Sequence, residues 1–280
     1  MAENTAIQWT KHTFNPWWGC TKVGPGCDHC YAETFDKRVG GSHWGTGQPR
    51  RLVKDWSKPR QWNREAAKTG ERPWVFCASM ADVFDNEVPD EWRDRLWDLV
   101  RECQNLNWQF VTKRVGNVAK MIPADWAENF RHCGIIATVV HQEEADRDIP
   151  KLVRLKPATR WIGLSIEPQI GPIDLSPWLN SLDWIITGGE SGHGARPYDP
   201  VWAKSLIDQG RRTGVPVFVK QMGAKPVGLK LVDAKGGNAG EWPPSLQVRQ
   251  MPRIAFEPPS ANTAKRSEAT DVTPNLPQGE

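Results

Sequence analysis

The sequence predicts an α/β domain built on a full or partial TIM-like (β/α) barrel of parallel strands. Short apolar segments recur along the chain, and helical segments separate most of them. Polar residues stand directly after most of these apolar segments. Strands that alternate with helices pair in parallel through right-handed crossovers, which curl the sheet and bring the strand ends to one face. An open doubly wound sheet is the alternative.

The predicted strands are short apolar segments bounded by Gly, Pro or polar residues. Residues 134–140 have the apolar, β-branched composition of a strand covered on both faces. The first segment is the weakest and leads into a cysteine-rich loop. In chain order the predicted strands span residues 7–10, 74–77, 108–112, 134–140, 160–166, 184–187 and 216–219.

Four segments are predicted to be helices, at residues 31–39, 90–103, 143–155 and 200–213. The second has one apolar face, formed by Trp92, Leu96, Leu99, Val100 and Cys103. Pro150 predicts a break or kink in the third. In the fourth, Asp199 suits the N-cap, Pro200 the first turn and Gly214 the position after the last turn.

The remaining segments set the domain organisation. Residues 40–72 are rich in Gly, Pro, Arg and Trp and are predicted to form an irregular insertion in a barrel-like domain spanning 1–240. Residues 241–280 are Pro-rich and are predicted to be a largely disordered tail, above all from 255 onward. No apolar run reaches the roughly 20 residues of a membrane span. The N-terminus lacks a basic-then-apolar signal pattern, so a cytoplasmic protein with no membrane partner is expected.

Three of the six cysteines lie close together, as Cys20, Cys27 and Cys30. Gly24, Pro25 and Gly26 between the first two favour a tightly wrapped loop. Three convergent thiols are a ligand set for a soft metal centre, and they leave one metal position open. A structural zinc site completed by His29 or His12 is the alternative, and a loop without metal is another. The other cysteines lack ligand spacing and are predicted core residues: Cys77, Cys103 and Cys133.

Polar residues at the predicted strand ends are expected to meet on one rim of the barrel, together with the cysteine loop. They are Ser79, Asp82, Thr112, Lys113, Arg114, Ser165, Glu167, Gly188, Gly189, Glu190, Ser191, Lys220 and Gln221. Basic and aromatic residues also alternate between 44 and 64. This combination is typical of grips on single-stranded nucleic acid, but a charged segment packed by its own Trp side chains is the favoured interpretation.

Several stretches together resemble a family of phage and bacterial proteins of uncharacterised function that is noted for a three-cysteine motif. They are Ile7-Gln-Trp-Thr, Asn15-Pro16, Gly19-Cys20, Gly26-Cys27, Cys30-Tyr31-Ala32-Glu33 and residues 76–84, 110–114, 163–173, 188–197 and 217–223. The resemblance covers roughly residues 5–225. It implies a TIM-barrel-like fold related to the radical S-adenosylmethionine (SAM) enzymes. In those enzymes three cysteines hold a [4Fe–4S] cluster, whose fourth iron binds the amino and carboxylate groups of SAM.

The resemblance implies that the strand-end residues are candidate SAM ligands. Carboxylates at Asp82, Glu167 or Glu190 would take the ammonium of SAM, and Lys113, Arg114 or Lys220 would take its carboxylate. Ser79 is a further candidate, as are Gly188 and Gly189, where the backbone can approach the ligand closely.

The sequence leaves three functions open. The first is a radical SAM-like iron–sulfur enzyme that cleaves SAM reductively, with a nucleic-acid base or nucleotide as candidate substrate. The second is a zinc-stabilised nucleic-acid-binding protein without catalysis. The third is a non-catalytic barrel subunit of a partner enzyme.

Overall fold

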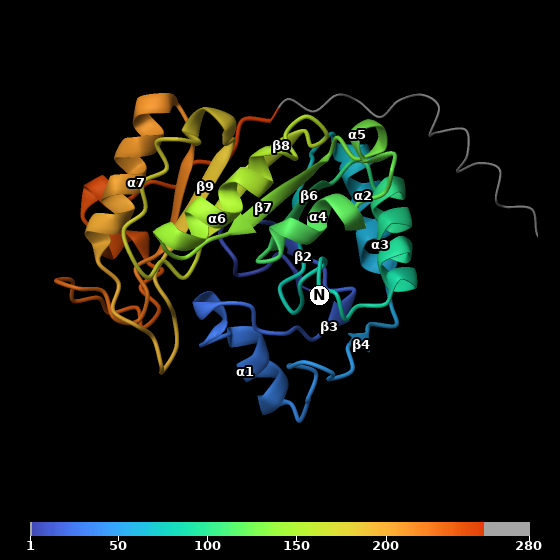
Figure 1. Cartoon of the computed structure of the whole chain (residues 1–280), viewed down its shortest axis with the longest axis horizontal. Helices are drawn as coiled ribbons and strands as arrows, with labels where there is room; N and C mark the ends of the chain where they lie inside the picture. Colours follow the sequence, from blue (N-terminus) through green and yellow to red (C-terminus); the bar gives the residue numbers. More distant parts are fainter. Residues whose placement is uncertain (1, 255–280) are drawn as a thin grey trace, which may run out of the picture.

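The computed structural model describes residues 2–254 and contains a curled half-barrel sheet (Figure 1). The sheet has eight strands in the order β1-β2-β5-β6-β7-β8-β9-β10, and all its pairings except β1 with β2 are parallel. The strands are β1 (Ala2–Glu3), β2 (His12–Thr13), β5 (Trp74–Cys77), β6 (Asn107–Thr112), β7 (Cys133–Thr138), β8 (Trp161–Ile166), β9 (Trp184–Gly188) and β10 (Val217–Gln221). Within the described residues the edge strands β1 and β10 do not pair, so the predicted barrel is partial.

Helices connect most of the parallel strands, as the alternating pattern predicts. They are α1 (Tyr31–Arg38), α2 (Ser57–Thr69), α3 (Asp90–Glu102), α4 (Val115–Met121), α5 (Trp126–Asn129), α6 (Gln142–Val153) and α7 (Pro200–Thr213). A separate two-stranded sheet joins β3 (Trp17–Trp18) to β4 (Arg51–Leu52). No helix of this described part combines the length and apolar character that a membrane crossing demands.

The two faces of the sheet carry separate apolar clusters. The larger cluster packs the helices against one face and includes Leu96 of α3, Ile149 of α6 and Leu206 of α7. The smaller cluster covers the concave face and consists of Trp9, Phe76, Ile136, Trp161, Trp184, Ile186 and Phe218. This division follows from the two-residue period of a strand, which sends successive side chains to opposite faces. The concave aromatic residues fill the half-barrel below its rim.

The first predicted strand is wrong. Residues 7–10 form a turn, in which Thr10 N donates to Ile7 O at 3.3 Å, and the strand comes after it as β2. Trp9 of this turn is nonetheless buried, and its ring centroid lies 4.9 Å from that of Phe76. The apolar composition of residues 7–10 therefore reflects packing on the concave face and not participation in the sheet.

The predicted irregular insertion at 40–72 contains a helix. Helix α2 buries Pro59, Trp62 and Ala66, which recur at helical spacing, and ends at Gly70 with φ 73°. The segment before it is irregular apart from β4. The predicted break at Pro150 is wrong, because helix α6 continues through Pro150 to Val153. The caps predicted for α7 at Asp199 and Gly214 are confirmed.

The chain beyond β10 returns to the domain. Trp242 and Leu246 are buried, and Val219 N donates to Val248 O at 2.8 Å. Residues 241–254 of the predicted tail thus pack against β10 and α7. Residues 255–280 lie outside the described residues.

His132, before β7, makes a pH-dependent contribution to stability. Its ring is buried, Nε2 lies 2.9 Å from Val100 O, and burial lowers its pKa to about 4. In the unfolded chain the pKa returns to about 6.5, so the unfolded state binds the extra proton between these values. The stabilisation is therefore complete above about pH 6.5 and is lost as the pH falls toward 4.

We expect the unfolding free energy to drop by about 2 kcal/mol from this residue between about pH 7 and about pH 4.5. Urea denaturation of the wild type and of His132→Gln at the two pH values checks this. The variant should show a smaller difference between the two pH values, and an equal difference in both proteins would contradict the prediction.

Candidate functional site

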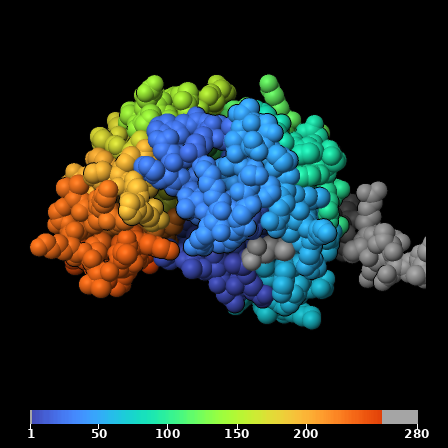
Figure 2. Space-filling model, turned by 90° about the horizontal axis from the view of Figure 1, so that it is seen from below, coloured from blue at the N-terminus to red at the C-terminus, as the bar shows by residue number. Residues whose placement is uncertain are grey.

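A cavity of about 480 Å³ lies at the carboxyl ends of the parallel strands. Viewed from the side on which α1 lies, the blue N-terminal residues cover the centre of this face, beside the orange residues near the C-terminus (Figure 2). The predicted rim residues that line the cavity are Cys20, Cys27, Cys30, Ser79, Asp82, Thr112, Lys113, Arg114, Ser165, Glu167, Ser191, Lys220 and Gln221. Parallel strands therefore bring the sequence-predicted polar ends together on one rim.

The cysteine loop is held close to its neighbours by its glycines. A Cβ on Gly24 would lie 2.6 Å from Oε1 of Glu144, and one on Gly26 would lie 2.7 Å from Cγ1 of Val140. A side chain at Gly26 would therefore clash with the branched Val140 side chain, whereas one at Gly24 would displace the end of the Glu144 side chain. Cys27 ends a short 3-10 turn and Cys30 is the N-cap residue of α1. The loop thereby brings all three thiols to the cavity.

The three thiols share the cavity but do not yet meet at one point. Within residues 2–254, no three His, Cys, Asp or Glu side chains are grouped closely enough to hold a metal ion. Sγ of Cys20 lies 3.3 Å from Nη1 of Arg114. Burial raises the pKa of the Cys20 thiol to about 12, and the Arg114 guanidinium opposes this shift.

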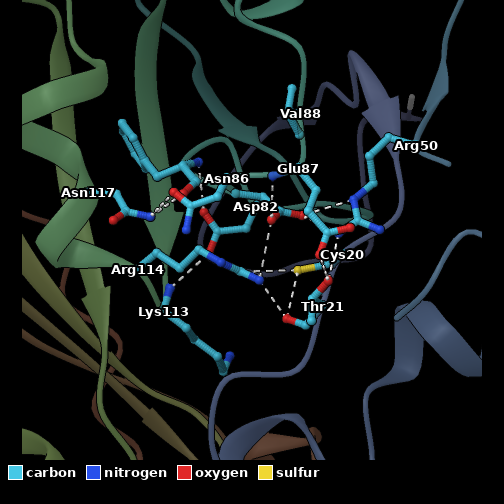
Figure 3. Close-up of polar contacts among 12 residues, drawn as sticks. Cys20, Thr21, Arg50, Asp82, Asn86, Glu87, Val88, Lys113, Arg114 and Asn117 are labelled. Atoms are coloured by element: carbon cyan, nitrogen blue, oxygen red, sulfur yellow. Dashed lines mark hydrogen bonds and ion pairs between the residues drawn. The ribbon is translucent and has the colours of Figure 1, made fainter. Parts of the chain in front are cut away.

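Asp82 holds Arg114 in place against the cysteine loop (Figure 3). Both side chains are 8% exposed, and Nη1 of Arg114 lies 3.2 Å from Oδ2 of Asp82. The same carboxylate accepts hydrogen bonds from Thr112 Oγ1 at 2.8 Å, Lys113 N at 3.1 Å and Phe84 N at 3.0 Å. With its oxygens satisfied within the protein, Asp82 acts as a positioning residue, and the predicted role as an ammonium ligand has no free oxygen to support it.

A second buried arginine supports the same loop. Nη2 of Arg114 donates to Thr21 O at 2.6 Å, and Nη2 of Arg50 donates to Thr21 Oγ1 at 2.7 Å. Arg50 also pairs with Asp85 at 2.8 Å and with Glu87 at 3.4 Å (Figure 3). Sequence reasoning placed Arg50 in a basic segment that could grip nucleic acid. Its side chain is only 1% exposed, so it serves the loop instead.

The other residues of the basic segment at 44–64 fit the favoured interpretation, a charged segment packed by its own Trp side chains. Trp56 and Trp62 are buried, and their rings pack in the main core. Arg60 pairs with Glu102 and Lys58 with Glu3. The segment is thus an ordinary charged surface packed by its own Trp side chains, although Trp44 also lines the cavity.

Glu190 lies behind the cysteine loop and is absent from the described cavity lining. It accepts hydrogen bonds from Arg196 N at 2.9 Å and Arg196 Nη2 at 2.8 Å, and its Oε2 lies 2.9 Å from Nδ1 of His29. Arg196 in turn donates to Pro25 O at 3.0 Å. Burial opposes ionisation of Glu190, but the hydrogen bonds from Arg196 and His29 outweigh it and hold the pKa below its usual value.

Glu190 therefore fastens the loop through Arg196 and His29. The same contact bears on the zinc alternative, because Glu190 engages Nδ1 of His29. His12 belongs to β2 and stacks on Trp62, with ring centroids 4.2 Å apart. Neither histidine is among the described residues that line the cavity.

Gly188 and Gly189 allow close packing of β9 against β10. A Cβ on Gly189 would lie 2.6 Å from Met222 O, and one on Gly188 would lie 2.9 Å from Oε1 of Glu167. Neither glycine is among the described residues of the cavity wall. The close approach in this structure is to the segment that contains Met222 and to the Glu167 side chain, and approach to a ligand at these glycines stays a prediction.

The remaining predicted site residues, Glu167, Lys220 and Ser79, each contact another residue near the cavity. Oε1 of Glu167 lies 3.2 Å from Nζ of Lys220, which joins the ends of β8 and β10. Ser79 Oγ lies 3.0 Å from Asn15 Nδ2, and Ser79 O accepts from the Tyr31 hydroxyl at 2.8 Å. Sequence reasoning gave no site role to Trp9, Thr138 or Lys235, which also line the cavity. Thr138 is the last residue of β7, but the predicted strand extended to residue 140, so its position at a strand end was not apparent from the sequence.

We expect Glu190→Gln to loosen the cysteine loop. The change removes charge-assisted hydrogen bonds to Arg196 and His29, which contribute about 1.5–3 kcal/mol each to local stability. Amide hydrogen exchange of residues 26–30 should become at least tenfold faster, while Glu128→Gln, at an exposed helix position, should leave it unchanged. Unchanged exchange in Glu190→Gln would show that the loop is held by other contacts.

These features define the class of this protein: a mostly parallel α/β half-barrel with a three-cysteine loop over a cavity at its strand ends. The chain belongs to the family described as Protein of unknown function (DUF5131), whose family model matches residues 4–252. No curated protein matches the chain.

Several solved structures of spore photoproduct lyase are similar to this chain at low identity. A double mutant with bound AdoMet and dinucleoside spore photoproduct is 12% identical over 76% of this chain and 56% of its own, with a TM-score of 0.44. A single mutant is 11% identical over 79% of this chain and 58% of its own, with the same TM-score of 0.44. This chain thus spans little more than half the length of those two proteins. The complex with dinucleoside spore photoproduct is 11% identical, with a TM-score of 0.43 and coverage of 72% and 74%.

Proposed function

We propose that this protein is a radical SAM-like iron–sulfur enzyme, in which Cys20, Cys27 and Cys30 hold a [4Fe–4S] cluster. One observation carries the proposal: all three thiols line the same cavity as the charged groups at the ends of β5, β6, β8 and β10. A cavity of about 480 Å³ is within the size range of small-molecule and cofactor sites. The three cysteines also match the cluster ligands of radical SAM enzymes in number and in position within the loop, although six residues separate the first two here.

The donor set fits the cluster in its chemistry. Thiolates are the ligands that iron–sulfur clusters take, and three of them leave one iron open. A cluster held by thiolates is anionic, and Arg114 beside Cys20 offsets that charge. The three sulfurs must come closer together than they lie here, and the Cys20 and Cys30 side chains, which are only partly buried, can turn toward the cluster while the loop backbone stays in place.

The cavity wall supplies groups suited to SAM. Lys113 lines the cavity, and within the described residues it forms no ion pair, so its ammonium is free to bind the SAM carboxylate. Glu167, paired with Lys220, is the carboxylate best placed to share its charge with the SAM ammonium. When bound, a reduced cluster supplies the electron that cleaves SAM to a 5′-deoxyadenosyl radical. Trp9 and Phe76, at 3% and 8% exposure, form an apolar floor that excludes water from the reaction.

The charges around the cavity favour an anionic substrate, with a nucleotide or nucleic-acid base as the proposed class. Asp82 and Glu167 are each paired with a cation of the site. The wall also carries the cations Lys22, Lys113, Arg114, Lys220 and Lys235. Lys22 pairs with Glu33 at 3.2 Å, whereas Lys113 and Lys235 form no ion pair within the described residues, so these two ammonium groups attract phosphate or carboxylate groups.

Metal and sulfide analysis of protein prepared without oxygen tests the proposal. The expected result is about four irons per chain, with matching sulfide, and SAM cleavage after reduction. Zinc without iron would support the structural zinc site instead. An intact cluster that never cleaves SAM would favour a non-catalytic subunit of a partner enzyme.

A further inference from the structure

Arg114 stands out among the charged residues of the site because it contacts a proposed cluster ligand directly. Nη1 lies 3.3 Å from Sγ of Cys20, and Nη2 donates to the carbonyl of the next residue, Thr21, at 2.6 Å. The guanidinium thus reaches both the side chain and the backbone of the ligand segment (Figure 3). Its own position is fixed by Asp82 at 3.2 Å and by Asp85 at 3.6 Å.

The burial of the Arg114 guanidinium determines how strongly its charge acts on the Cys20 sulfur. The Arg114 side chain is 8% exposed, so its charge acts on the sulfur with little screening by water. The reduction potential of an iron–sulfur cluster depends on net charge nearby and on hydrogen bonds to its sulfurs. A cation that donates to a ligand sulfur stabilises the more negative, reduced cluster and raises the potential.

We infer that Arg114 is a positioning residue that fixes Cys20 as a cluster ligand and raises the reduction potential of the cluster. This inference rests on the proposed function. The inference adds to the proposed function that the buried Arg114 guanidinium controls how readily the cluster accepts the electron needed to cleave SAM. Because Arg114 binds Thr21 O as well as the sulfur, it keeps the ligand segment in place even if the Cys20 side chain turns toward a cluster.

Arg50 offers a matched control within the same network. Its guanidinium is also buried, pairs with Asp85 and binds Thr21 through Oγ1. Within the described residues it donates no hydrogen bond to a cysteine sulfur. Removing its charge therefore perturbs the shared acidic network without removing a contact to the proposed cluster ligand.

The experiment is a redox titration, followed by electron paramagnetic resonance, of reconstituted wild type, Arg114→Gln, Arg114→Lys and Arg50→Gln. We expect Arg114→Gln to shift the reduction equilibrium at least tenfold toward the oxidised cluster, which is about 59 mV for one electron. Arg114→Lys keeps the positive charge but loses the planar guanidinium that contacts the Cys20 sulfur and the Thr21 carbonyl together. A smaller shift in the same direction is therefore expected. Arg50→Gln should shift the potential less than either variant.

The outcomes separate the two proposals. Equal potentials in wild type and both Arg114 variants, with iron retained, would overturn the role of Arg114 and leave the iron–sulfur site intact. A wild type that takes up no iron would overturn both. If Arg114→Gln does not fold, as judged by circular dichroism, the comparison between Arg114→Lys and Arg50→Gln decides the matter. A shift in Arg114→Lys that does not exceed the control would then count against Arg114.

Discussion

Replacing Cys27 with alanine is expected to remove the iron of the reconstituted protein almost completely. A cluster held by three thiolates has no spare ligand, and the other described cysteines outside the loop are buried in the core. Cys27 belongs to the 3-10 turn that lies between Cys20 and Cys30 in the sequence. Its loss leaves only two thiolates in the loop to hold the cluster. Iron per chain should fall at least tenfold relative to wild type treated in parallel.

The matched control is Cys103→Ala. Cys103 caps α3 and is fully buried in the main core, away from the cavity. Its loss should lower stability by about 1 kcal/mol, as expected for a small core truncation, and leave the iron content unchanged. Full iron content in Cys27→Ala would show that Cys27 is not a ligand. Loss of iron in both variants would point to general destabilisation instead.

Asp82→Asn is expected to produce the largest loss of stability among substitutions at the rim. The change removes the charge of a side chain that is 8% exposed and leaves the buried Arg114 guanidinium without its nearest carboxylate. Breaking a buried pair by removing one partner destabilises a protein by about 3–5 kcal/mol. Because Asp85 remains 3.6 Å from Arg114 and Asn retains one acceptor, we expect about 3 kcal/mol.

Urea denaturation measures this loss, with Asp98→Asn as the control. Asp98 pairs with Arg101 at 2.8 Å, but its side chain is 72% exposed, and such surface pairs contribute about 0–1 kcal/mol. A loss below about 1 kcal/mol in Asp82→Asn would show that Asp85 and the backbone carbonyls are sufficient to hold Arg114.

The predicted strands were confirmed where apolar character and burial coincide. The strand predicted at 74–77 has those bounds in the structure, and those at 160–166 and 184–187 differ by one residue at one end. The segment at 7–10 was wrong because Trp9 is apolar for a different reason, its packing on the concave face. A hydrophobic pattern reports burial, and a short segment can be buried without pairing. Helix α2 was missed because its polar composition and internal Pro59 mask a narrow buried stripe.

The candidate site was predictable as a set of positions but not as a set of roles. Parallel strands place their polar ends on one rim, so Ser79, Asp82, Lys113, Glu167 and Lys220 meet around one cavity. Nothing in the local sequence distinguishes Glu167 beside the cavity from Glu190 behind the loop. That difference arises because Arg196 and His29 occupy the oxygens of Glu190.

The sequence by itself determined the alternation of strands and helices, the rim on which the polar ends collect, and the loop that carries three thiols. These features depend on local composition and spacing, which are written directly in the chain. The tertiary structure alone decided the partner of each charged side chain. Arg114 meets Cys20 across 94 positions of sequence, and Arg196 meets Pro25 across 171. Contacts over such separations are selected by how the whole half-barrel packs, because burial forces each charge to find a partner wherever the fold brings one.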